Sequence, residues 1–249
     1  DAQAMLEQVV DEGWLAAKAV IGFFPANAQG DDIELYTDDS RESVRAMVHF
    51  LRQQMVKSKE RPNMCLADFV APGDTGLVDY IGAFAVTTGI GIEKKLAEFA
   101  TANDDYSSIL LKALADRLAE AFAERMHERV RKEFWGYAVD EDLDNAALVR
   151  EVYRGIRPAP GYPACPDHGE KATLFALLQA EENASMRLTE SFAMLPAAAV
   201  SGFYFSHPEA RYFGIGRIGC DQVADYARRK GATIEHTERW LASNLDYER

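Results

Sequence analysis

The stretch "YIGAFAVTTG" (residues 80–89) and the long run that follows it decide the fold class of this chain. The first is rich in residues that favour strands and ends in a glycine, so we expect a buried strand. From about Asp104 to Phe134, apolar residues then recur at three- and four-residue spacing, which predicts the longest helix of the chain. Its end, "ERMHERVRKEF", is rich in cations, as a helix C-terminus prefers. A buried strand followed by a long amphipathic helix indicates a mixed fold.

Working outward, the remaining pattern gives further helices and strands without any internal repeat. The expected helices cover about residues 6–20, 40–55, 144–154, 170–183, 220–230 and 233–242. The expected strands cover residues 33–36, 199–205 and 211–218, the last two joined by the turn "HPEA" (207–210). Because no low-complexity linker interrupts the pattern, we predict one α+β domain over residues 1–249.

Composition and charge exclude several classes of protein. The 249 residues carry 27 lysines and arginines against 40 acidic residues, a formal charge of −13, so nucleic acid and anionic membranes should repel the chain. No run approaches the roughly 20 apolar residues of a membrane span, and no signal peptide opens the chain. The three cysteines are far apart in sequence, which suits a reducing cytoplasm and argues against a disulfide framework.

The most unusual stretch is "GIRPAPGYPACPDH" (155–168), which holds four of the nine prolines. We call it the proline-rich loop. Proline fixes φ and restricts its predecessor, so the backbone should be stiff, extended and poor in internal hydrogen bonds. Arg157 then offers a forked cation for a carboxylate or phosphate, Gly161 permits close approach, and Tyr162 presents a ring. The alternative is a rigid connector between two helices, with Arg157 solvated and Tyr162 in the core.

Other candidate residues are weaker by spacing alone. Tyr212 and Phe213 would face opposite sides of a strand, so one can line a groove while the other packs, although both can equally pack. Glu120 lies three residues from Arg117 on the long helix, which is also the spacing of a simple surface pair. Cys165 and His168 have no second Cys/His pair for zinc, and nucleophile-elbow, P-loop and complete dinucleotide motifs are missing. We therefore predict no metal site and no catalytic acid, base or nucleophile.

Seven stretches of the chain carry a resemblance to a known family, the C-terminal activation domain of cobalamin-dependent methionine synthase. They are "FFPANAQGDDIELY", "CLADFVAP", "DYIGAFAVTTG", "DDYSSILLKALADRLAEAFAERMHERVRKEFWGYA", "GIRPAPGYPACPDH", "LTESFAMLPAAAVSGFYFSHPEARYF" and "DQVADYARRKG". The resemblance extends over about residues 1–247 and implies a single C-shaped α+β domain, with helices around an antiparallel β-sheet and not Rossmann-like. It also implies that this chain begins after an upstream "DWTPFF"-type segment of the family domain.

The resemblance implies a site for S-adenosylmethionine in a shallow groove. The family's RxxxGY-type motif is matched by Arg157, Gly161 and Tyr162, with Arg157 holding the methionyl carboxylate. Backbone groups around Ala159 and Tyr162 would serve the rest of the ligand. Glu120, Tyr212 and Phe213 match further ligand-contact positions of the family.

The implied chemistry is repair of an oxidised cofactor on another module. An electron from flavodoxin or a similar reductase, followed by a methyl group from S-adenosylmethionine, would convert cob(II)alamin to methylcobalamin. A sulfonium methyl group needs aim rather than an activating acid. Cobalamin would be held by the cobalamin-binding module of methionine synthase, because no DxHxxG motif occurs here, and the chain alone would not complete the synthase reaction. The alternative is a non-catalytic docking or capping module for a cobalamin-binding domain.

A flavodoxin-type partner is usually acidic, as this chain is, so attraction would require local basic clusters. The candidates are "ERVRK" (128–132), "ARRK" (227–230) and the pair Arg211 and Arg217. Each cluster is equally explained as a solvated face.

Overall fold

A computed structural model describes residues 1–58 and 60–248. The strands are β1 (Ala16–Gln29), β2 (Asp32–Tyr36), β3 (Val44–His49), β4 (Asp79–Ile90), β5 (Arg187–Leu188), β6 (Met194–Leu195) and β7 (Ala199–Tyr204). The α-helices are α1 (Ala2–Asp11), α2 (Ile92–Thr101), α3 (Asp105–Arg129), α4 (Asn145–Val149), α5 (Glu170–Leu178), α6 (Ala180–Ala184), α7 (Cys220–Lys230) and α8 (Ile234–Trp240). Short 3-10 turns occupy Leu66–Phe69, Gly73–Thr75 and Ala242–Asn244, and a π-helical turn (Val130–Phe134) extends α3.

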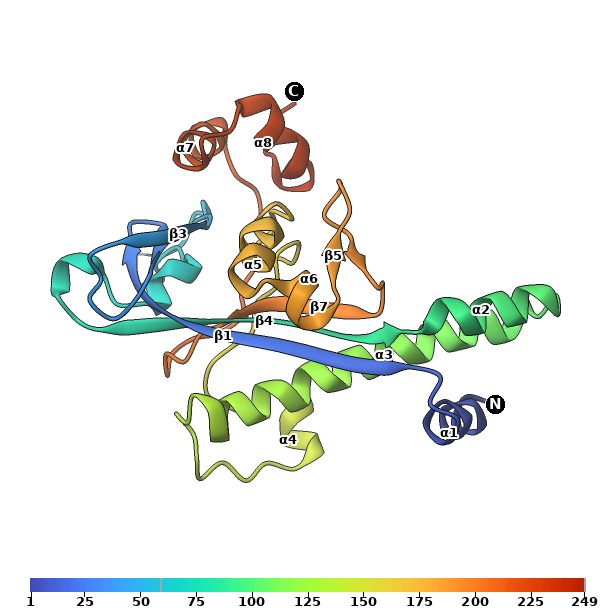
Figure 1. The fold of residues 1–249 in the computed structure, drawn as a ribbon. Helices are drawn as coiled ribbons and strands as arrows, with labels where there is room; N and C mark the ends of the chain where they lie inside the picture. Colours follow the sequence, from blue (N-terminus) through green and yellow to red (C-terminus); the bar gives the residue numbers. More distant parts are fainter. Residues whose placement is uncertain (59, 249) are drawn as a thin grey trace.

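The centre of the molecule is a five-stranded antiparallel sheet in the order β3-β2-β1-β4-β7. Helices α5 and α6 lie over one face and α3 runs along the other (Figure 1). Because side chains alternate along a strand, β1 and β4 contribute apolar side chains to a core on each face of the sheet. Val20 and Phe24 pack toward the α5 and α6 side, whereas Ile21 and Phe23 pack toward the side of α3.

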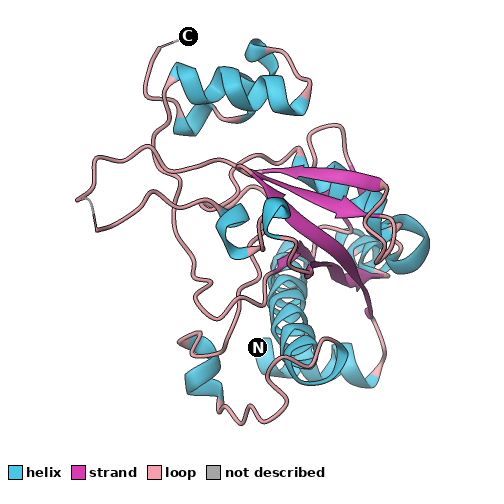
Figure 2. Cartoon of the chain, turned by 90° about the vertical axis from the view of Figure 1, so that its left-hand side faces the viewer, coloured by secondary structure: helices cyan, strands magenta, loops and turns pink. Residues whose placement is uncertain are grey.

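Helices α7 and α8 form a smaller lobe with its own apolar cluster, built on Ile215, Ile218, Val223 and Leu241. Figure 2 shows these helices standing beyond the sheet, reached by long loops. In the described part of the chain, no helix is long and apolar enough to cross a membrane.

The structure confirms the predicted α+β class and most of the elements expected from the sequence. The buried strand at 80–89 is β4, and the long helix at 104–134 is α3 with its π-helical turn. The strands at 33–36 and 199–205 are β2 and β7, and the "HPEA" turn closes with a 3.0 Å hydrogen bond from the Ala210 amide to the His207 carbonyl. The last two helices are α7 and α8. The helix expected at 170–183 is two helices, because Gln179 takes φ +47° between them.

The prediction of one helix over residues 6–20 was wrong. Helix α1 ends at Asp11, Gly13 takes φ +63°, and residues 16–29 form β1, the longest strand. The apolar residues of α1 happen to continue into those of β1 at helical spacing. Pairing with β4 decides the outcome, because every residue from Lys18 to Ala26 finds a partner there.

Two further local predictions were wrong, and one predicted helix is shorter than expected. Residues 40–55 contain β3, not a helix, because Val44, Ala46 and Val48 alternate and pair with β2. Residues 211–218 form one bridge, between Ile218 and Leu245, and Gly216 takes φ +74°, so no second strand follows the turn. The helix expected at 144–154 is only α4, five residues long.

Candidate functional site

The sheet positions the first half of the proline-rich loop. Gly155 takes φ +84°, and Ile156 then exchanges two 3.0 Å hydrogen bonds with Phe205, just beyond β7. The Pro158 carbonyl accepts a 2.9 Å hydrogen bond from the Phe203 amide. Between these two anchors, the Arg157 amide donates to the Tyr212 hydroxyl at 3.0 Å. The loop therefore continues the sheet, and Arg157 occupies a fixed point beside its last strand.

The Arg157 side chain reaches back to α3 and is not the solvated arginine of the rigid-connector alternative. Its Nη2 lies 2.7 Å from Glu124 Oε2, and its Nη1 donates to the Tyr153 hydroxyl at 2.7 Å and to His127 Nδ1 at 3.1 Å. The side chain is 20% exposed. A charge with this many protein partners contributes to the fold as well as to any ligand site.

His127 is neutral in this environment. Burial, followed by the neighbouring guanidiniums of Arg131 and Arg157, holds the pKa of His127 well below its ordinary value. Because Nδ1 accepts from Arg157, the ring proton is on Nε2, which lies 3.5 Å from the Tyr137 hydroxyl. The imidazole also stacks on Tyr204, with ring centroids 5.1 Å apart. His127 therefore acts as an acceptor for Arg157, and a protonated His127 would repel it.

A second, fully buried arginine supports the same cluster. Arg131 is paired with Glu141 through contacts of 2.7 to 3.0 Å, and its guanidinium lies 4.1 Å over the ring of Tyr153. Its Nη1 is 3.9 Å from Glu124 Oε1, so Glu124 stands between two arginines. We call Glu124, His127, Arg131, Tyr153 and Arg157 the arginine cluster.

The arginine cluster leaves part of the Arg157 fork free. A guanidinium has five N–H donors, of which the Nε–H and one Nη2–H form one edge suited to a carboxylate. The two Nη1 contacts and the ion pair to Glu124 account for three donors. Among the described residues, Nε has no hydrogen-bond partner. Nε–H and one Nη2–H of Arg157 therefore remain for a further acceptor.

The middle of the proline-rich loop is exposed, whereas its beginning is packed against the sheet and α3. Gly161 takes φ +95°, its amide donates to the Cys165 carbonyl at 2.7 Å, and a Cβ there would overlap the ring of His168. The next side chain, Tyr162, is 67% exposed. A pocket of about 450 Å³ lies here; its lining residues are Gly161, Tyr162, Pro163, Pro166, His168, Gly214, Gly216, Trp240, Ser243 and Asn244. Both the positive φ and the close approach of the His168 ring therefore favour glycine at 161.

The remaining predicted site residues divide between exposed and packed positions. Tyr212 is 39% exposed beside Arg157, whereas Phe213 packs between the two apolar clusters and lies 6.4 Å from Phe69. The two side chains diverge, which is one of the two outcomes that the sequence left open, although no strand holds them. Glu120 is exposed and pairs with Arg117 at 2.8 Å, one turn before Glu124 on α3. The Ala159 carbonyl accepts from the Tyr162 amide at 3.2 Å, and its own N–H has no partner in the described chain.

The structure offers no metal centre among its described residues. Cys165 is buried, with its pKa raised well above normal by burial, and His168 Nδ1 accepts a hydrogen bond from Lys171 at 3.0 Å. The pair in "CPDH" is therefore committed to the fold.

Sequence reasoning missed Glu124, His127 and Tyr153. A signal for the first two was present, since Glu120, Glu124, His127 and Arg131 recur at spacings of four, three and four along α3 and the π-helical turn that extends it. Tyr153 could not be found this way, because the turn after α4 brings it to α3.

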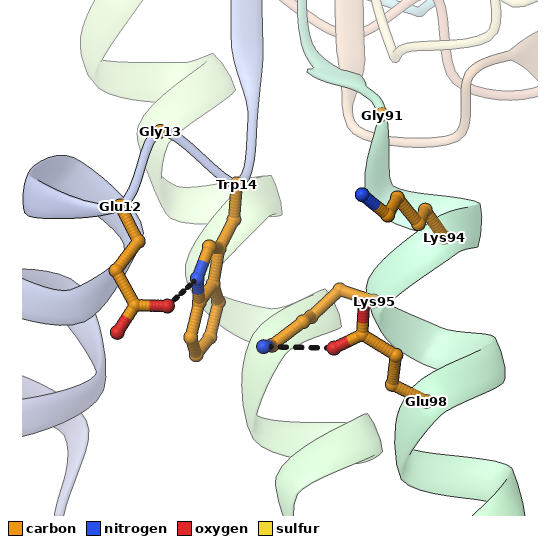
Figure 3. Close-up of a pocket in the computed structure, with 7 residues that line it drawn as sticks. All are labelled: Glu12, Gly13, Trp14, Gly91, Lys94, Lys95 and Glu98. Carbon is orange, nitrogen blue, oxygen red and sulfur yellow. Dashed lines mark hydrogen bonds and ion pairs between the residues drawn. The ribbon is translucent and has the colours of Figure 1, made fainter.

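A further hollow of about 370 Å³ lies at the other end of the molecule, between the end of α1 and the start of α2 (Figure 3). Its centre is occupied by Lys95, whose Nζ is 3.9 Å from the centroid of the Trp14 ring and 2.9 Å from Glu98 Oε2. Its main cation is thus already partnered, and none of the predicted site residues lines it.

The antiparallel sheet excludes a Rossmann-like dinucleotide-binding fold. The chain is an α+β domain, and its ligand site would be formed by the proline-rich loop. Residues 1–231 match the family described as "Vitamin B12 dependent methionine synthase, activation domain". The chain belongs to this family. It is also similar to the solved "Crystal Structure of the MetH Reactivation Domain bound to AdoHcy", with 56% sequence identity and a TM-score of 0.96, over 100% of this chain and 76% of that one.

Proposed function

We propose that this activation domain binds S-adenosylmethionine at the proline-rich loop and delivers its methyl group to cobalamin held by another module. The observation that carries the proposal is the 56% identity, over the whole chain, to a reactivation domain solved with AdoHcy. AdoHcy is what remains of S-adenosylmethionine after methyl transfer, so one groove would serve both.

We assign the residue roles from the hydrogen-bonding groups and exposed side chains that the fold does not use. The unpartnered Nε edge of Arg157 would take the ligand carboxylate, and the Ala159 N–H would take one ligand acceptor. The exposed ring of Tyr162 would cover the adenine, and Tyr212 would line the groove beside Arg157. Glu120, exposed one turn from Glu124, would face the ligand amine. Gly161 would fix the loop, and Phe213 would hold Tyr212 in place from the core.

The reaction requires no acid or base from this chain. Cobalamin on the partner module would be the methyl acceptor. After one-electron reduction by the reductase it would take the sulfonium methyl group, and AdoHcy would remain in the groove. The residues of this chain would bind S-adenosylmethionine and orient its methyl group toward the acceptor. In a displacement of this kind, such positioning supplies most of the rate enhancement.

We further propose that flavodoxin or a similar reductase docks near Arg211 and Arg217, in a reducing cytoplasm. Of the three predicted basic clusters, the other two are largely neutralised: Arg131 is buried with Glu141, and Arg229 and Lys230 pair with Asp32, Asp167 and Glu170. Within residues 1–58 and 60–248, the side chains of Arg211 and Arg217 donate hydrogen bonds to the sulfur of Met64 and to backbone carbonyls, and to no carboxylate. Reactivation by an acidic reductase should slow with rising salt, and a rate indifferent to salt would exclude this docking mode.

The competing function is a capping module that covers cobalamin without donating a methyl group. Calorimetric titration with S-adenosylmethionine tests binding, with Tyr162→Ala expected to weaken it and Tyr106→Ala, an equally exposed tyrosine on α3, serving as control. Chemistry is then followed as AdoHcy formed in the presence of reductant and a cobalamin-carrying module. Binding without AdoHcy would favour the capping module, and no binding would overturn the proposal.

A further inference from the structure

Strand β1 has a free edge over most of its length. Residues 16–26 pair with β4 on one side, but β2 pairs only with residues 26–29 on the other. Among the described residues, we find no backbone hydrogen bond of residues 16–25 outside the ladder with β4. In Figure 1 this part of β1 runs along the front of the sheet toward α1, and the pairing with β2 is confined to its far end. Alternate N–H and C=O groups of this edge are therefore available to another strand.

An apolar groove runs beside this edge, on the α3 side of the sheet. It has a volume of about 390 Å³ and is lined by Ala19, Ile21, Phe23, Met126 and Phe134. The first three are successive side chains on one face of β1, and each is only half-buried. Four residues of strand extend about 13 Å, which is room for two or three side chains of a neighbouring strand.

The free edge carries no charge between Lys18 and the end of the groove: residues 19–24 are "AVIGFF". An exposed, uncharged, apolar edge strand pairs readily with other chains and is normally blunted by charge or proline. Here Lys18 stands at one end, hydrogen-bonded to Ser185 at 2.8 Å, and Pro25 at the other, where β2 takes over. Neither blocks the six residues between them. The combination of free hydrogen-bonding groups and an apolar groove indicates a strand-addition site.

We propose that an extended polypeptide segment adds to this edge of β1 as a further strand and places alternate apolar side chains in the groove. The choice of occupant rests on the length of the solved reactivation domain. This chain covers 76% of that chain, so about a quarter of it has no counterpart in residues 1–249. We assign the added strand to that unmatched quarter, whether it is supplied by the same polypeptide or by another. Main-chain bonds would give affinity, and the groove would fix the register.

The test uses the 249-residue chain and, as probe, the unmatched quarter of the solved reactivation domain made as a separate polypeptide. Backbone hydrogen exchange of residues 16–25 should slow at least 10-fold when the probe saturates the chain. Ile21→Asp should weaken binding at least 10-fold. Val44→Asp, at an exposed position on β3, should leave it unchanged. Circular dichroism and thermal melting show whether each variant is folded.

Three results would overturn the proposal. The first is saturable binding with no protection of residues 16–25. The second is absence of protection both with the separate probe and after joining the two pieces through a flexible linker. The third is protection that appears with the chain alone and rises with its concentration in step with dimer formation by sedimentation, because the occupant would then be a second copy. S-adenosylmethionine binding is measured separately, so a failure here leaves the proposed function standing.

Discussion

The two ends of the proline-rich loop are tied down by charges, whereas its middle is held by backbone alone. At one end Arg157 is paired with Glu124 on α3, and at the other Asp167 is paired with Lys230 and accepts a 2.9 Å hydrogen bond from Tyr226, both on α7. Between them, Gly161 and Tyr162 depend on backbone hydrogen bonds within residues 159–165 and on the absence of a side chain at 161. The loop therefore connects the main body to the small lobe and exposes only its centre.

This difference separates what a substitution does to the fold from what it does to the ligand. Changes in the middle should act through backbone geometry. Changes at the Arg157 end should act through buried charge, and should affect stability and binding together.

The largest expected effect is that of Gly161→Ala. A Cβ at this position meets His168 and must also adopt φ +95°, so we expect a loss of about 3 kcal/mol in the free energy of unfolding, the sum of backbone strain and overpacking. Gly76→Ala is the control, because Gly76 has φ +68° but open space around it, and should lose only about 1 kcal/mol. Urea denaturation measures both. Equal losses would mean that the close approach to His168 is unimportant.

At the charged end, Glu124→Ala should cost about 2–3 kcal/mol of stability. It leaves Arg157 and the fully buried Arg131 without their shared counter-charge; the figure is below that of a fully buried pair because Glu124 is 24% exposed. Glu120→Ala, one turn away and exposed, should change stability by less than about 0.5 kcal/mol. If the two variants melt alike, the arginine cluster does not stabilise the fold.

The smallest effect is a pH dependence that originates at His127. Its folded-state pKa lies well below the ordinary value because of burial and two arginines, so below about pH 6.5 the unfolded chain binds a proton that the folded chain excludes. The contribution of His127 to the free energy of unfolding is fully present above that pH. It decreases as the pH falls, by at most about 1.4 kcal/mol per pH unit. In His127→Gln, unfolding curves between pH 5 and 7 should lose this contribution. An unchanged slope would mean that His127 has the same pKa in the folded and the unfolded chain.

The sequence predicted the elements whose periodicity and partners agree, such as β4 and α3. It failed where local spacing and tertiary pairing disagree: residues 16–20 and 44–49 have helical spacing but are strands because β4 and β2 pair with them. For the site, proline and glycine chemistry located the loop and gave Gly161 its role. The partners of Arg157 could not be predicted from the sequence. Glu124 and Tyr153 meet Arg157 only because α3 packs against the segment after α4.

The central claim is that the free edge of Arg157 holds the carboxylate of S-adenosylmethionine. The most direct measurement compares that ligand with 5′-methylthioadenosine, which keeps the adenosine and sulfur but lacks the carboxylate, on the wild-type chain and on Arg157→Ala and Arg157→Lys. We predict that Arg157→Ala loses about 1.5–3 kcal/mol, or about 10- to 150-fold, for S-adenosylmethionine and almost nothing for methylthioadenosine. Arg157→Lys should recover only part of the loss, because an ammonium cannot make a two-pronged contact. Equal losses for both ligands in a folded Arg157→Ala variant would contradict the claim and leave Arg157 as a purely structural member of the arginine cluster.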